Sequence, residues 1–242
     1  MNQIQRISLQ SAFVLHGRPY RESSLLLDVF SRDYGKIALL AKGVRGNRSR
    51  LSAILQPFIP LSLSWSGKTD LQTLTGAEQI PPGICLQGRR LYCGLYLNEL
   101  LSYFLHRHDA HRNLFSHYAA ALVALAGLGE AEETLRYFEL ALLEEIGFGL
   151  QIEQDAEHGG PIRPDRRYEY RIGLGLVESN NLLGGIAGST LINLARRSLD
   201  GPVQLSESKK MMRAVIDHHL AGKALRSRSL FIPKPAKNQS SE

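Results

Sequence analysis

Short runs of alternating apolar and polar residues occupy the first eighty positions, a pattern typical of half-buried β-strands. The run 61–65, Leu-Ser-Leu-Ser-Trp, alternates with period two. A turn is expected at Gly17-Arg18-Pro19, and a second turn signal at Asp33-Tyr34-Gly35 separates two further apolar runs. The pattern predicts strands over residues 12–15, 24–30, 36–40, 61–65 and 71–75. Five short strands, with an irregular insertion between the third and the fourth, predict the small, partly open barrel called the OB-fold.

The periodicity becomes helical after Pro81-Pro82-Gly83, which predicts a domain boundary there. Helices are expected over residues 87–106, 114–125, 131–146, 186–198 and 206–221, and a small hairpin over 168–177. Gly147 is a typical signal for the C-terminal end of the third helix. The chain is therefore predicted to be α+β, with a barrel domain over 1–80 and a mostly α-helical domain, carrying a small irregular hairpin, over 81–242.

Positive charge gathers at the two ends of the chain. The net charge is +6, with ten Lys and Arg against five Asp and Glu in residues 1–80, a mildly acidic middle part, and a basic tail over 223–242. The segment 41–50, Ala-Lys-Gly-Val-Arg-Gly-Asn-Arg-Ser-Arg, carries four cations and two glycines without an acid. Because cations that release counterions dominate nucleic-acid affinity, we expect this loop and the strand before it to bind DNA phosphates. The expected contacts are Lys36, Lys42, Arg45, Arg48 and Arg50.

Cysteine usage and hydropathy limit where the protein works. Cys85 and Cys93 are too few for a disulfide framework, and the first ten residues lack the apolar core of a signal peptide. No uncharged apolar run is long enough to predict a membrane span. These features predict a cytoplasmic protein. Among the aromatic residues, Trp65 is expected in the barrel core, whereas Tyr34, in a turn, could either pack or stack on a base.

Motifs for covalent chemistry are absent from the sequence. It contains no G-x-x-x-x-G-K-[ST] loop, no G-x-S-x-G and no H-E-x-x-H. Three further histidines and an aspartate accompany His106 within twelve residues, but a polar turn between helices explains this spacing better than a metal site does. These residues are His108, Asp109, His111 and His117. The sequence therefore predicts no catalytic residues, no cofactor and no metal.

Seven segments form a characteristic series along the chain. They are residues 12–15, the pair Glu22-Ser23, and residues 41–45, 55–61, 95–100, 136–143 and 225–231. In this order and spacing they resemble the RecO recombination-mediator family of bacterial DNA repair over nearly the whole length. The resemblance implies an N-terminal OB-fold, a helical C-terminal domain, and no ATPase or nuclease activity.

The same resemblance implies partners. Family members bind single- and double-stranded DNA, anneal complementary strands, and help to load RecA on strands coated with the single-stranded-DNA-binding protein SSB. They also bind the RecR protein. The resemblance thus implies a RecFOR-pathway function in the cytoplasm, at the nucleoid.

One departure from the family concerns metal. Many members carry a four-cysteine zinc site near the predicted hairpin, whereas this chain has no cysteine after Cys93. A zinc site of four cysteines therefore cannot form, and other packing must hold this stretch.

Arg136 is the candidate for partner binding. It lies near the start of the predicted helix 131–146, where a cation opposes the helix dipole and an anionic partner would relieve the conflict. The family's binding of the acidic, Phe-ending SSB tail supplies such a partner, with Arg136 and Tyr137 as expected contacts. An ion pair with Glu132 or Glu133 is the structural alternative.

Two other functions stay open at this point. One is an RNA-binding OB-fold protein, which a preference for RNA over DNA of the same sequence would reveal. The other is a metal-dependent nucleic-acid enzyme that uses the group between His106 and His117, which bound metal would reveal.

Overall fold

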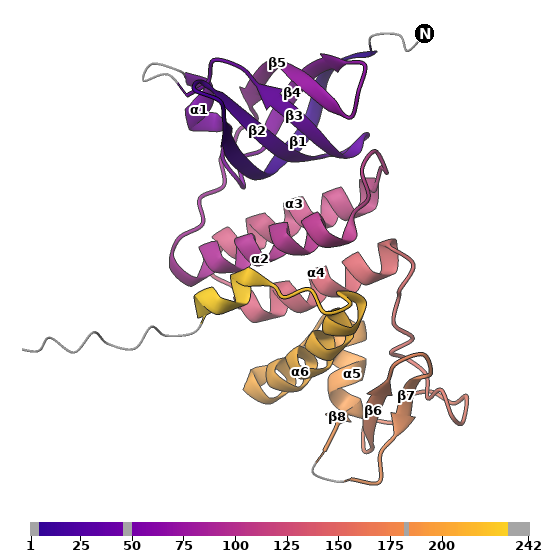
Figure 1. Cartoon of the computed structure of the whole chain (residues 1–242). Coiled ribbons are helices and arrows are strands. Elements are labelled where there is room, and N and C mark those ends of the chain that lie inside the picture. Colours follow the sequence, from indigo (N-terminus) through magenta and orange to yellow (C-terminus); the bar gives the residue numbers. More distant parts are fainter. Residues whose placement is uncertain (1–4, 46–49, 182–183, 232–242) are drawn as a thin grey trace, which may run out of the picture.

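A computed structural model describes residues 5–45, 50–181 and 184–231 of the chain. Figure 1 shows a barrel at one end, a layer of three helices beneath it, and a smaller unit of helices and short strands at the other end. The α+β prediction and the five-stranded, OB-like N-terminal part are confirmed. No helix in the described ranges is long and apolar enough to cross a membrane.

The barrel contains five strands in the order β1-β2-β3-β5-β4. Their bounds are β1 (Gln5–Tyr20), β2 (Ser24–Ser31), β3 (Gly35–Ala41), β4 (Leu61–Gly67) and β5 (Leu71–Gln79), and a short helix α1 (Arg50–Ile54) precedes β4. The sheet is closed, rather than partly open as the sequence predicts, because β1 pairs with both β2 and β4. Trp65, only 1% exposed, lies in the barrel core as predicted, and the Tyr34 ring packs edge-on against it.

β1 is much longer than the predicted strand over 12–15. The predicted turn at Gly17-Arg18-Pro19 is wrong, since this segment continues the strand and pairs with β2 up to Tyr20. The chain reverses instead at residues 21–23, where Arg21 has a φ of 52°. Pairing with β2 holds residues 17–20 in the strand, so tertiary context overrides the local turn signal.

All five predicted helices are present, with shifted ends. They are α2 (Gly88–Phe104), α3 (Arg112–Ala126), α4 (Ala131–Glu145), α5 (Gly188–Ala195) and α6 (Gly201–His219), followed by a 3₁₀ helix η1 (Arg226–Phe231). α6 begins five residues before the predicted start, because Pro202 is tolerated in the first turn of a helix. The predicted hairpin corresponds to β6 (Arg167–Arg171) and β7 (Gly175–Glu178), and β8 (Ile186–Ala187) pairs with β6.

Hydrogen bonds and apolar packing hold the stretch where other family members are expected to carry zinc. The Asp155 carboxylate accepts the backbone N–H of Glu157 at 2.9 Å and pairs with Nδ1 of His158 at 2.9 Å. Behind this turn, Ile152, Ile162 and the ring of Tyr168 lie in a core shared with α5 and α6. Buried apolar side chains and these hydrogen bonds thus stabilise this small unit.

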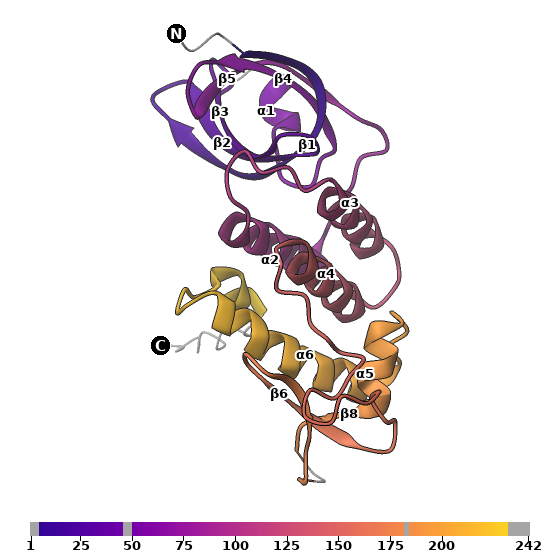
Figure 2. The same ribbon diagram turned by 90° about the vertical axis from the view of Figure 1, so that its right-hand side faces the viewer.

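Aromatic side chains join the barrel to the helices. Phe13 and Phe30 are cross-strand neighbours on the outer face of β1 and β2. Their ring centroids lie 5.4 Å from that of Phe115 in α3, and Phe13 also meets Tyr118 edge-on at 5.2 Å. Asn98 of α2 donates to the backbone carbonyl of Leu15 at 2.9 Å. The helical core therefore extends onto the outside of the barrel, as the adjacent layers in Figure 2 show.

The loop between α2 and α3 makes a second contact with the barrel. The backbone N–H of His108 donates to the Lys36 carbonyl at 3.0 Å, and the Arg112 guanidinium pairs with Asp33 at 2.7 Å. Gly35 has a φ of 63°, and a Cβ built on it would lie 1.9 Å from the carbonyl oxygen of Asp109. Only glycine satisfies both constraints at this point of close approach.

Replacing Gly35 by Ala is expected to destabilise the protein more than replacing Gly147 by Ala. Both glycines have positive φ, so each substitution costs about 1–2 kcal/mol for the left-handed conformation. Gly147 has open space around it, whereas at Gly35 the overlap with Asp109 adds about 1–3 kcal/mol. Urea denaturation of the two variants measures the difference, and equal decreases in stability would contradict the close approach of loop and barrel.

Candidate nucleic-acid and partner sites

The predicted basic loop is exposed where the structure describes it. Lys42, Arg45 and Arg50 are all exposed, while Arg48 lies outside the described residues. The Arg45 guanidinium donates to the backbone carbonyls of Arg21 and Glu22 at 3.0 and 3.3 Å. Arg45 therefore links the loop to the β1–β2 turn while its side chain stays exposed.

A groove of ≈ 830 Å³ opens between this turn and the start of the basic loop. Tyr20, Arg21 and Lys42 line it, and the Arg21 guanidinium lies 5.3 Å from the centre of the Tyr20 ring. Beside the groove, the cross-strand row Arg18, Leu26 and Leu40 lies on the same outer face of the sheet. Among the residues that the structure describes, Glu22 is the one acid that lines the groove, beside two cations and the Tyr20 ring.

Sequence reasoning missed Tyr20, Arg21 and Arg18 because it assigned a turn to residues 17–19. The run Arg18-Pro19-Tyr20-Arg21 interleaves an aromatic residue with cations, which is a signal for nucleic-acid binding. Recognising that β1 continues through Pro19 would have placed these three side chains beside Lys42.

Lys36, the fifth predicted DNA contact, lies outside this groove. Its ammonium donates to the backbone carbonyl of Ser102, near the end of α2, at 2.6 Å. Burial lowers the pKa of Lys36, and the neighbouring Arg107 and Lys223 cations lower it further while Asp28 opposes them. The residue joins the barrel to the helical domain because the helical layer covers this end of β3.

Arg136 is buried, and its partner is a residue that the sequence analysis did not consider. Its guanidinium donates to the carboxylate of Glu139, which also accepts from the Tyr96 hydroxyl at 2.7 Å. Arg136 is 4% exposed and Glu139 is fully buried. Burial raises the pKa of Glu139, although the Arg136 cation opposes this effect. The positive charge of Arg136 is thus neutralised by Glu139 rather than by Glu132 or Glu133.

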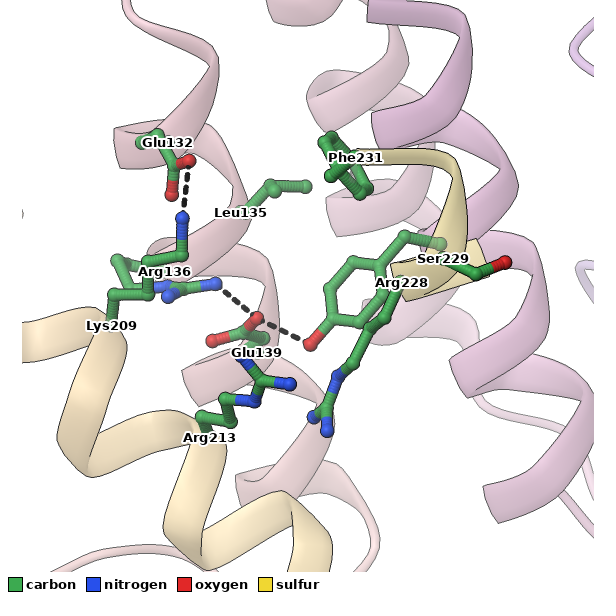
Figure 3. A pocket seen from close by; sticks show the side chains of 10 residues that line it. Glu132, Leu135, Arg136, Glu139, Lys209, Arg213, Arg228, Ser229 and Phe231 are labelled. Atoms are coloured by element: carbon green, nitrogen blue, oxygen red, sulfur yellow. Dashed lines mark hydrogen bonds and ion pairs between the residues drawn. The ribbon is translucent and has the colours of Figure 1, made fainter. Parts of the chain in front are cut away.

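A pocket of ≈ 330 Å³ opens directly above this ion pair, between α4, α6 and η1. Figure 3 shows Lys209 and Arg213 on its α6 side and Leu135 and Phe231 on the other. Lys209 pairs with Glu132 at 2.7 Å, whereas Arg213 is 4.0 Å from Asp217, so the Arg213 guanidinium is the less constrained cation. Four cations and two carboxylates line the pocket, together with Tyr96, Ser229 and two apolar side chains. The charged residues are Arg136, Lys209, Arg213, Arg228, Glu132 and Glu139, and the apolar ones are Leu135 and Phe231.

Tyr137, the other predicted partner residue, lies on a different side of α4. Its hydroxyl donates to Glu133 at 2.7 Å and accepts the backbone N–H of Leu199 at 2.9 Å. Burial and the bond to Glu133 raise the pKa of Tyr137 to about 12. The structure therefore does not bring Tyr137 together with Arg136, because consecutive helical residues point about 100° apart.

The histidine-rich turn between α2 and α3 separates its side chains. His108 approaches Asp70 of the barrel at 3.5 Å, and His111 lies between Asp109 and Glu145 at 3.4 and 3.5 Å. His117 lines a small pocket against α4 instead. In residues 5–45, 50–181 and 184–231, no three His, Cys, Asp or Glu side chains form a group that could hold a metal ion.

Comparison with known proteins decides the family. Residues 5–82 match the family described as "Recombination protein O N terminal", and residues 85–229 match "Recombination protein O C terminal". The chain belongs to the RecO family. It is 46% identical over 226 residues to the DNA repair protein RecO of Methylococcus capsulatus, covering 93% of each chain. It is also 44% identical over 229 residues to RecO of Nitrosococcus oceani, again over 93% of each chain.

A third relative agrees with these two. RecO of Vibrio cholerae is 45% identical over 226 residues, which covers 92% of this chain and 93% of the relative. The resemblance found in the sequence is therefore confirmed for both domains. The N-terminal match covers the residues of the groove, and the C-terminal match covers the residues of the Arg136 pocket except Phe231.

Replacing Arg136 by Ala in this RecO family member is expected to cost about 3–5 kcal/mol of stability, because it leaves Glu139 buried without a cation. The decrease should shrink as the pH is lowered. A buried carboxyl with a raised pKa contributes stability at low pH, and this contribution is lost as the pH rises through the folded-state pKa.

The double variant Arg136→Leu with Glu139→Leu is the matched control. It should recover most of the stability, because apolar residues of similar size can replace a buried ion pair at little cost. Urea denaturation at several pH values measures both effects. A single variant as stable as the wild type, or a destabilisation that grows at low pH, would contradict the buried pair.

Proposed function

We propose that this RecO family member is a DNA-binding recombination mediator without covalent chemistry. It binds single- and double-stranded DNA, anneals complementary strands, and helps to load RecA on strands coated with SSB. It requires no nucleotide, cofactor or metal. Since its substrate is chromosomal DNA, it acts in the cytoplasm at the nucleoid, and its family makes RecR a further expected partner.

The groove beside the β1–β2 turn is the observation that carries the DNA proposal. The Arg21 guanidinium lies 5.3 Å from the centre of the Tyr20 ring, and Lys42 lines the same groove. Arg45 holds the adjacent loop to the turn, and the sequence of the barrel has a net positive charge. Phosphates of a single strand can pair with the cations while a base stacks on the ring, since every base offers a flat face. Such contacts are independent of sequence, as a mediator that acts on any damaged site requires.

Strand annealing follows from the same electrostatics. Two complementary strands repel each other through their phosphates, and a cationic surface that binds one strand lowers its net charge. The second strand then approaches with less repulsion, and base pairing supplies the free energy of annealing. The protein contributes positioning and charge, so no residue needs to act as an acid, base or nucleophile.

The Arg136 pocket is the proposed site for the SSB tail. A short acidic peptide ending in phenylalanine presents several carboxylates and one apolar ring. Arg213 and Lys209 lie at the rim for the carboxylates, while Leu135 and Phe231 offer apolar surface for the ring. The Arg136–Glu139 pair forms the floor of this pocket. Tyr137 lines a different pocket, so this proposal leaves it out of the peptide site.

Separate sites for DNA and SSB explain mediation without strong individual contacts. The groove is lined by residues of the barrel, and the pocket by residues of the helical domain, including α6 and η1. Figure 1 shows α6 and η1 on the side of the helical layer that faces away from the barrel. A protein held to SSB through its tail experiences a high effective concentration of the DNA that SSB covers. Weak binding at each site therefore adds up to a stable complex on coated DNA.

Replacing Lys42, Arg45, Arg48 and Arg50 together by Ala is expected to weaken binding to all single strands alike. The slope of log affinity against log salt should fall by about 0.7 for each phosphate that the variant no longer binds. Fluorescence anisotropy at several salt concentrations measures this, with Lys210→Ala, an exposed lysine of α6, as the control. An unchanged slope would contradict phosphate binding by the loop, and tighter binding of RNA than of DNA would favour an RNA-binding function.

Replacing Arg213 by Glu is expected to weaken binding of a labelled acidic peptide ending in phenylalanine by at least about tenfold, because it puts a carboxylate at the pocket rim. Arg213 is largely exposed, so this variant avoids the folding defect expected for Arg136→Ala. Lys210→Glu makes the same charge change outside the pocket and should leave peptide binding unchanged. Equal affinities for wild type and Arg213→Glu would place the peptide elsewhere.

A further inference from the structure

Cations also gather where the barrel meets the helical domain. Lys36, Arg107 and Lys223 come from β3, the α2–α3 loop and the segment between α6 and η1. They are close enough for the Arg107 and Lys223 charges to lower the pKa of Lys36, after the effect of burial. The Lys223 ammonium lies 5.7 Å from the centre of the Tyr103 ring. Tyr103 is 38% exposed.

This junction lies at the end of the same sheet face that holds the groove. Lys42 follows β3 directly, and Leu40, Ala38 and Lys36 occupy alternate positions back along the strand, so all four face outward. The strand rise of about 3.3 Å per residue separates Lys42 from Lys36 by about 20 Å. Cross-strand partners continue the face, with Arg18 beside Leu26 and then His16 beside Asp28.

Arg107 connects the barrel face to the helical domain. Its guanidinium lies 3.8 Å from the Asp28 carboxylate, which belongs to the row between the groove and Lys36. Both side chains are nearly half exposed. Such a long, exposed ion pair contributes little, so Arg107 can exchange Asp28 for a phosphate at small cost.

Compensation of the α2 dipole explains only part of this charge. Lys36 donates to the Ser102 carbonyl in the last turn of α2, as cations commonly do at helix C-termini. A helix end is equivalent to about half a negative charge, which Lys36 already exceeds. Lys223 and Arg107 are exposed and add charge that the helix end does not require. The exposed ring of Tyr103, which lies next to Lys223, is not part of the hydrophobic core either.

We infer that a bound single strand crosses from the barrel groove onto the helical domain, where Arg107 and Lys223 bind its phosphates and Tyr103 stacks on a base. The inference rests on the proposed DNA-binding function and extends it to a second, junction site. A strand held at both ends of the outer sheet face is extended between them, with its bases free to meet a complementary strand.

Dependence on oligonucleotide length tests the junction site. Single-stranded oligonucleotides of about 4 and about 24 nucleotides lie at the lower end of, and beyond, the site size of one OB-fold. At about 3.4 Å per nucleotide the short one covers about 14 Å, which is less than the distance of about 20 Å between Lys42 and Lys36. The triple variant Tyr103→Ala, Arg107→Ala and Lys223→Ala should bind the short one as the wild type does and the long one about tenfold more weakly. The salt slope with the long oligonucleotide should fall by about 1.4, because two phosphates of the single strand are no longer neutralised.

The conservative variant Tyr103→Phe with Arg107→Lys and Lys223→Arg keeps the ring and the charges, so it should bind both lengths as the wild type does. Circular dichroism verifies that both variants are folded. Unchanged binding of the long oligonucleotide by the Ala variant would overturn the junction site while leaving the groove intact. A folded Ala variant that binds both lengths equally more weakly would also overturn it.

The two proposals fail in different ways. Failure of the groove would appear as unchanged binding in the basic-loop variant, whatever the junction variants do. A glutamate homopolymer that competes with the long oligonucleotide on the wild type but not on the Ala variant would reassign the junction to an acidic protein partner, and would overturn the inference.

Discussion

The packing of Phe13 and Phe30 against Phe115 and Tyr118 fixes the relation between the two halves of this protein. Large apolar side chains on the outside of a barrel cannot stay in water without a decrease in stability, so the helical layer must cover them. Asn98 fixes the orientation of the helices on the barrel, because it donates to the Leu15 carbonyl and accepts from the Tyr118 hydroxyl in a buried position. Rotation of the helices would leave these polar groups without partners.

This contact also divides the outer sheet face. The end with Phe13, Phe30 and Lys36 is covered, and the end with Arg18, Tyr20 and Lys42 stays open. A nucleic-acid strand therefore has access to only part of the barrel, next to the cations of the helical domain. The helical layer supports the barrel and, at the same time, defines where a strand can continue beyond it.

Buried charge in the helical domain has a different role from exposed charge. The Arg136–Glu139 pair is removed from water and bonded to Tyr96, and these three residues line the pocket. Arg213 and Lys209 at the rim keep their hydration and can respond to a ligand. One pocket thus combines rigid and adaptable cations, a combination suited to short acidic peptides because their backbone must be ordered on binding.

The sequence by itself determined the strands, the helices and the family, because alternation with periods of two and 3.6 is a local property and the ordered series of segments is specific. It also located the exposed cations of the basic loop. It could not show that β1 continues through Pro19, since that depends on pairing with β2. Nor could it show that the side chain of Lys42 is exposed whereas that of Arg136 is buried and that of Lys36 is partly buried. Only the tertiary structure decided that Lys36 meets the Ser102 carbonyl, and that Arg136 and its neighbour Glu139 are buried together against Tyr96, because burial and packing partners set the role of a charge.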